Sequence, residues 1–117
     1  MELHELSHDE LIALVGLLEL MGASEGEIPD EEAVRIEGVA RQLGEERYRA
    51  VAAEVDRRFR DEGELKAFLS TITRRPAREL IYGVLFDTAV PGAIDRRESR
   101  LLEWLAKEWD IETTFAE

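Results

Sequence analysis

Apolar residues recur along this chain at spacings of three and four, which is the period of an amphipathic α-helix. No stretch alternates polar and apolar residues with β-branched side chains, so no sheet is expected. The pattern predicts one domain over residues 1–117, an all-α bundle of about six helices. Their predicted ranges are 7–21, 29–43, 45–60, 65–72, 76–89 and 95–109.

Local signals place several of these helix ends. Ser7 and Glu10 have the spacing of a capping box, in which each side chain bonds to the backbone N–H of the other residue. Gly44 is expected to end the second helix. The fifth helix is nearly all apolar after Leu80 and is expected to be central. Trp104 and Trp109 are expected in the core, with Trp109, near the end of the last helix, partly exposed.

Two helix–loop–helix units emerge when the chain is compared with itself at a shift of 66 residues. The loops read SEGEIPDEE from Ser24 and VPGAIDRRE from Val90, with Gly, Ile and Glu at the same offsets. The aligned identities are Leu14/Leu80, Ala23/Ala89, Gly26/Gly92, Ile28/Ile94, Glu32/Glu98, Glu37/Glu103 and Ala40/Ala106. This duplication predicts two pseudo-symmetric repeats packed around one core.

The repeated Gly-x-Ile-x-x-x-Glu loop, opening an amphipathic helix each time, resembles the tellurite-resistance TerB family and its TerB-like relatives. The resemblance extends from Leu11 to Ile111. It implies an all-α bundle associated with tellurite and stress resistance, sometimes working beside membrane proteins. It also implies metal binding by acidic loop residues. The family's loop aspartate corresponds to Glu25 in the first loop but to Pro91 in the second.

Two interpretations of the loops stay open. In one, the pseudo-symmetry brings together Glu25, Glu32 and Glu98, whose carboxylates bind a divalent cation. In the other, the glycine makes a turn, the isoleucine fills the core and the glutamate bonds back to free N–H groups of its own helix. An EF-hand is not expected, because Ala89 and Pro91 occupy positions where calcium needs side-chain oxygens.

Composition and charge narrow the classes of partner. The chain is 44% hydrophobic, has no cysteine and carries a net charge of −12. Without cysteine, disulfides and thiolate metal sites are excluded. Residues 1–46 hold 13 acidic and two basic residues, whereas residues 47–109 carry a net charge of +2. This balance argues against nucleic acid, which needs a basic surface. It indicates either solubility alone, or a metal ion or basic protein surface facing the N-terminal half.

Location and self-association follow from similar arguments. No stretch approaches the roughly 20 apolar residues of a membrane span, and the acidic N-terminus lacks the basic flank of a secretory signal. We therefore expect a cytoplasmic protein that does not span a membrane, with a membrane protein as one candidate partner by resemblance. The arginines of residues 56–60, 73–78 and 95–100 are expected to pair with nearby acids at helical spacing. Alternatively, they dock on the acidic third of a second copy and form a homodimer.

The residues do not indicate catalysis. His4 and His8 are four apart, but two nitrogens do not complete a zinc site. Nucleophilic catalysis would need a histidine arranged beside Ser24, Ser70 or Ser99, and no pattern arranges one. We expect no enzyme and no catalytic residues. The leading hypothesis is an interaction module that binds a protein partner or a divalent cation. The alternative is a small-molecule-binding or catalytic protein with a carboxylate-lined pocket between the repeats.

Overall fold

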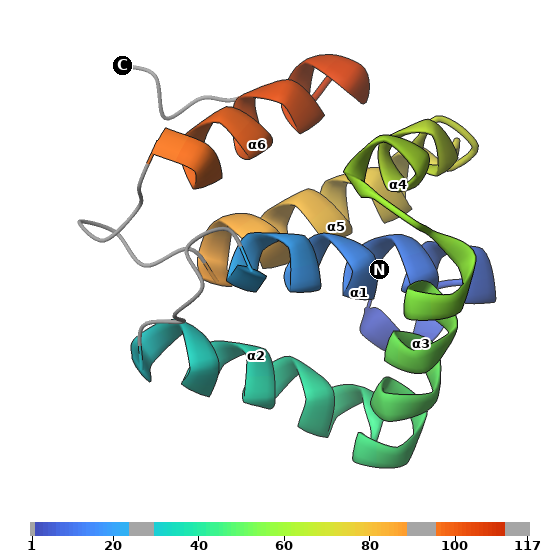
Figure 1. Ribbon diagram of the computed structural model, residues 1–117, viewed down its shortest axis with the longest axis vertical. Helices are drawn as coiled ribbons and strands as arrows, with labels where there is room; N and C mark the ends of the chain where they lie inside the picture. Colours follow the sequence, from blue (N-terminus) through green and yellow to red (C-terminus); the bar gives the residue numbers. More distant parts are fainter. Residues whose placement is uncertain (1, 24–29, 89–95, 112–117) are drawn as a thin grey trace.

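Six α-helices and one short 3-10 helix make up the described part of the chain in a computed structural model (Figure 1). The structure describes residues 2–23, 30–88 and 96–111. The elements are η1 (Leu3–Glu5), α1 (His8–Ala23), α2 (Asp30–Leu43), α3 (Glu45–Arg58), α4 (Glu62–Leu69), α5 (Arg75–Thr88) and α6 (Arg96–Glu108). These ranges contain no strand, so the predicted all-α bundle is confirmed.

Helix α1 is the centre of the bundle and contacts α2, α3, α4 and α5. Figure 1 shows it in the middle, with α2 and α6 at opposite ends of the view. Its buried hydrophobic residues are at most 1% exposed and are Leu11, Ile12, Ala13, Leu14, Val15, Leu17, Leu18 and Met21. They surround the helix instead of forming one face, because residues 11–20 contain a single charged side chain.

The prediction that the fifth helix is the central one was therefore wrong. Helix α5 buries Ile81 and Leu85, but Leu80 and Val84 on the same helix stay partly exposed. Its polar residues near the start, including Glu79, leave a solvent-facing side, whereas α1 has no comparable polar side. The central place in the bundle is taken by the helix that has the fewest polar positions around its circumference.

The capping box predicted at the start of α1 is present. The backbone N–H of Ser7 donates to Glu10 Oε1 at 2.8 Å, and the backbone N–H of Glu10 donates to Ser7 Oγ at 3.2 Å. Two N–H groups that lack helical partners are thereby satisfied. Gly44 ends α2 with φ of 96°, a left-handed conformation that favours glycine.

The end of α6 turns tightly and covers Trp109. The indole is fully buried and its Nε1–H donates to the carbonyl oxygen of Leu69 at 3.0 Å. Asp110 has φ of 52°, and the backbone N–H of Ile111 donates to the carbonyl of Ala106 at 2.8 Å, as in a Schellman motif. The prediction that Trp109 is partly exposed was wrong, because the end of α4 supplies a buried acceptor for its indole.

The two repeat loops lie mostly outside the described residues. Residues 24–29 and 89–95 fall between the described ranges, and each is followed by a helix, α2 or α6. The pseudo-symmetry of the two units therefore stays a prediction. None of the described helices combines the length and hydrophobicity needed to cross a bilayer.

Candidate functional site

A groove of about 680 Å³ opens between the N-terminal segment, α2 and α5. This volume is within the range of about 300–1,000 Å³ that is usual for ligand pockets. Three stretches of chain that are distant in sequence line it. The lining residues are Glu2, Leu3, His4, Arg35, Gly38, Val39, Gln42, Leu80, Val84, Asp87 and Thr88.

The floor of the groove is apolar and part of it remains accessible to solvent. Leu3 and Val39 are each 8% exposed, whereas Leu80 and Val84 are half-buried. Gly38 keeps the groove wide, because a Cβ at this position would meet no atom within 4 Å. A larger side chain at Gly38 would therefore extend into the groove without displacing the core.

The apolar surface continues from the groove onto α2. Val34 is 65% exposed and is the one large hydrophobic residue of the described ranges that lies in the exposed class. It lies four residues before Gly38, so the two positions share a helical face. Elsewhere on α2, Val39 is buried, and Ile36 and Leu43 pack against the core, whereas Val34 lies outside it.

A contact between α2 and α5 joins two residues that line the groove. Arg35 Nη1 donates to the backbone carbonyl of Asp87, near the end of α5. Carbonyls in the last turn of a helix lack helical partners and favour a positive charge. Thr88 Oγ1 donates to the carbonyl of Val84 at 2.8 Å within the same helix. The hydrogen bond of Arg35 thus links the two walls, whereas that of Thr88 stays within α5.

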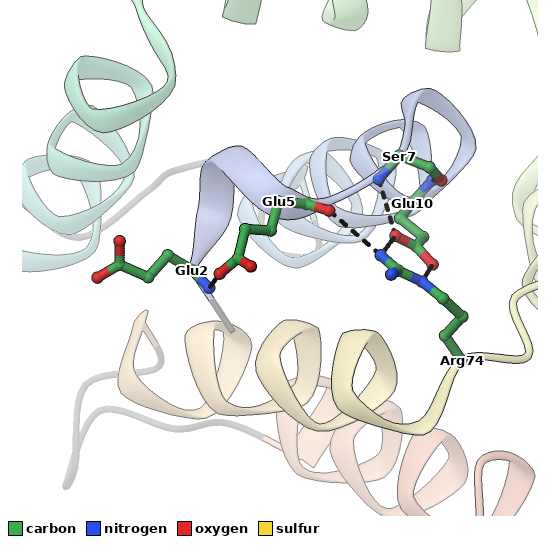
Figure 2. A network of polar contacts seen from close by, with 5 residues as sticks. All are labelled: Glu2, Glu5, Ser7, Glu10 and Arg74. Atoms are coloured by element: carbon green, nitrogen blue, oxygen red, sulfur yellow. Dashed lines mark hydrogen bonds and ion pairs between the residues drawn. The ribbon is translucent and has the colours of Figure 1, made fainter.

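The N-terminal wall is held by Arg74, which precedes α5 (Figure 2). Arg74 Nε donates to Glu10 Oε2 at 2.8 Å, and Nη2 donates to Glu10 Oε1 at 2.6 Å and to the carbonyl of Glu5 at 3.2 Å. Glu10 is only 5% exposed. The hydrogen bonds from Arg74 hold the pKa of the Glu10 carboxyl below its usual range, despite the opposing effect of burial.

The N-terminal segment also has a contact of its own. The backbone N–H of Glu2 donates to Glu5 Oε1 at 2.7 Å, which caps η1 (Figure 2). Since Arg74 binds the carbonyl of Glu5, this cap and the bidentate pair with Glu10 form one connected network. The network positions Leu3 and His4 along the groove.

Arginines of the arginine-rich segments form ion pairs with glutamates that are either near or far in the sequence. Arg58 lies 3.6 Å from Glu54, and Arg75 lies 3.3 Å from Glu79, both at the predicted helical spacing. Arg74 instead pairs with Glu10, 64 positions away in the sequence. Sequence spacing cannot reveal a pair of this kind, because the fold alone brings the two residues together.

The predicted metal ligands are not placed by the structure. Glu25 lies outside the described residues. Glu32 and Glu98 belong to the first turns of α2 and α6, but their side chains also lie outside the description. Among the side chains that are described, no group of three His, Asp or Glu residues could hold a metal ion. The cation site therefore stays a hypothesis.

The two histidines have separate acidic neighbours. His4 Nδ1 lies 3.7 Å from Glu2 Oε2 at the groove, whereas His8 Nε2 lies 2.8 Å from Glu54 Oε1 between α1 and α3. Away from the groove, burial raises the pKa of Glu19 and the negative charge of Asp56 adds to this effect. Glu19 does not line the groove, whose carboxylates are Glu2 and Asp87.

Sequence analysis missed the groove and most of its residues. The signal that was available is the pair Val34 and Gly38, an aliphatic residue and a glycine one turn apart on one helix. The η1 segment gave a weaker signal, the spacing of Glu2 and Glu5, which matches a helix cap. Neither signal indicates that α5 lies opposite.

Comparison with protein-family models, with curated proteins and with solved structures finds no match to this chain. The resemblance to the TerB-like family therefore stays a prediction made from the repeated loop pattern.

Proposed function

We propose that this protein is a non-enzymatic interaction module of the TerB-like type, and that the groove between η1, α2 and α5 is its binding face. The observation that carries the proposal is the accessible apolar floor of this groove and its continuation onto Val34. Contiguous apolar surface that is exposed and bordered by polar residues marks interaction sites in soluble proteins.

The polar groups of the groove support binding rather than a reaction. A catalytic site needs a nucleophile beside a base, or an acid and a base within reach of one substrate atom. The hydroxyl of Thr88 and the guanidinium of Arg35 are instead engaged by backbone carbonyls. Arg35 links the two walls, Thr88 bonds within α5, and the floor of the groove is left to apolar contacts.

Divalent-cation binding by Glu25, Glu32 and Glu98 remains a hypothesis within this proposal. Helix α2 begins at Asp30, so the first of the two repeat loops leads directly into a wall of the groove. A cation bound at the start of α2 would therefore act on the binding face. This would connect the acidic loops with the groove through one helix.

Site-specific photocrosslinking in the cells that make this protein tests the proposal. A photoreactive residue at Gln42, in the groove, is compared with one at Ala53, on the exposed side of α3. We expect a specific protein adduct from Gln42 alone. Gly38→Leu should abolish this adduct because its side chain fills the groove, while Gly83→Leu should preserve it. A Cβ at Gly83 also meets no atom within 4 Å, but Gly83 does not line the groove.

The same experiment can refute the proposal. Identical adducts from Gln42 and Ala53 would show that the groove has no specific partner. Adducts that persist in the Gly38→Leu variant would show that binding does not use the groove. A small molecule crosslinked to Gln42 in place of a protein would favour the alternative hypothesis of a small-molecule-binding protein.

A further inference from the structure

We infer that the occupant of the groove is a basic amphipathic helix of a partner protein. This inference rests on the proposed function and adds the chemistry of the partner. Three observations lead to it, namely the charge of the groove walls, the spacing of the apolar floor, and the absence of any sheet edge in the described ranges.

The charge of the walls favours a cationic partner. The N-terminal segment and α2 both belong to residues 1–46, which carry a net charge of −11. The carboxylates of Glu2 and Asp87 line the groove and belong to exposed residues. The one arginine that lines it, Arg35, already donates to the carbonyl of Asp87. An acidic concave surface with an apolar floor attracts cations and repels anionic groups such as phospholipid headgroups.

The apolar floor has the spacing of a helix surface. Leu80 and Val84 are four residues apart on α5, and Val34 and Gly38 are four apart on α2. Leu80 and Val84 at this spacing form a ridge on α5, whereas on α2 the side chain of Val34 is followed by the gap at Gly38. A third helix can lay its own apolar ridge between the two helices. Gly38 allows the backbone of such a helix to approach α2 closely, since no side chain occupies that position.

An extended peptide would find less to bind. Peptides that bind as strands obtain their affinity from backbone hydrogen bonds to a sheet edge. The described ranges contain only helices, whose backbone groups are bonded within each helix except at the ends. The groove therefore offers apolar side chains and charge, which are what a helix with apolar positions at i, i+3 or i+4, and i+7 recognises.

Two synthetic helical peptides of about 18 residues test the inference, since this length gives about five turns. Both carry leucine at i, i+3 or i+4, and i+7; one has lysine at the remaining positions and the other has glutamate. Fluorescence anisotropy measures their binding to the full chain. We expect the lysine peptide to bind at least about tenfold more tightly. Its affinity should also fall as salt rises from about 50 to about 300 mM.

Substitutions in the protein separate specific docking from general attraction between charges. Gly38→Leu should weaken the binding of the lysine peptide about tenfold, and Gly83→Leu should leave its binding unchanged. Val34→Lys and Val34→Glu remove the same apolar side chain but differ in charge. Val34→Glu should bind the lysine peptide at least about fivefold more tightly than Val34→Lys does.

Three results would overturn the inference. These are equal binding of the two peptides, unchanged binding of the lysine peptide to the Gly38→Leu variant, and equal binding to the two Val34 variants. If any of these results is found while photocrosslinking still gives a specific adduct at Gln42, the inference of a basic helix is rejected and the proposed function stands. Loss of the Gln42 adduct would reject the proposed function itself.

Discussion

Replacing Gly16 with alanine tests how closely α1 and α4 pack. An alanine Cβ at this position would lie 2.9 Å from Leu65 Cδ1 and 3.3 Å from Leu65 Cδ2. Leu65 is only 5% exposed, so its two methyl groups have little room to move away together. The substitution therefore forces a shift in the packing between the central helix and α4.

The matched control is Gly83→Ala, at a helical glycine where a Cβ would meet no atom within 4 Å. Alanine is favoured over glycine within a helix by about 1 kcal/mol, and both variants gain this amount. Overpacking in a core costs about 1–3 kcal/mol and affects only the first variant. The gain cancels between them, so we expect Gly16→Ala to be about 1–3 kcal/mol less stable than Gly83→Ala.

Urea denaturation followed by circular dichroism measures this difference, and thermal unfolding provides an independent check. For a domain of this size, 1 kcal/mol corresponds to about 4 °C in Tm. Gly83→Ala should raise Tm by about 4 °C, whereas Gly16→Ala should leave it unchanged or lower it. Leu65→Ala should cost less stability in the Gly16→Ala background than alone, because it removes the clashing methyl groups. Equal stabilisation by the two glycine substitutions would refute the close packing of α1 on α4.

Three further predictions address the N-terminal network, the end of α6 and the cation hypothesis. Glu10→Gln should lower the free energy of unfolding by about 1 kcal/mol at pH 7, because the half-exposed Arg74 loses a charged acceptor. The pKa of Glu10 is lowered from 4.5 in the folded protein, so its contribution is present above pH 4.5 and is lost as pH falls through the lower folded value. The free energies of unfolding of the unsubstituted protein and of Glu10→Gln, measured with urea from pH 7 to pH 3, should thus converge as pH falls. A difference that stays constant over this range would contradict the prediction. Asp110→Gly should raise stability in thermal unfolding by about 1 kcal/mol, since glycine adopts the φ of 52° without strain, whereas Asp110→Ala should give no gain. Calorimetric titration with calcium, magnesium, zinc and manganese should show binding that Glu25→Gln and Glu98→Gln each weaken; unchanged binding in both variants would reject the site of Glu25, Glu32 and Glu98.

Local interactions explain why the helices could be predicted from the sequence. The second helix was predicted at 29–43 and spans Asp30–Leu43, because an acidic start and the glycine at 44 act within one turn. The capping box of Ser7 and Glu10 involves residues three apart and forms as predicted. The third helix ends two residues earlier than predicted, at Arg58, because helix ends without a local stop signal are set by packing.

The tertiary contacts and the groove depend on residues that are distant in the sequence. The sequence indicated neither the bidentate pair of Arg74 with Glu10 nor the burial of Trp109 against the carbonyl of Leu69. The groove likewise exists only because the fold brings the N-terminal segment, α2 and α5 to one place. Helical periodicity reports which side of each helix is apolar, but the choice of neighbour depends on side-chain shapes and charges from different parts of the chain. The helices are therefore determined by interactions between residues close in the sequence, whereas the candidate site is determined by how the helices pack.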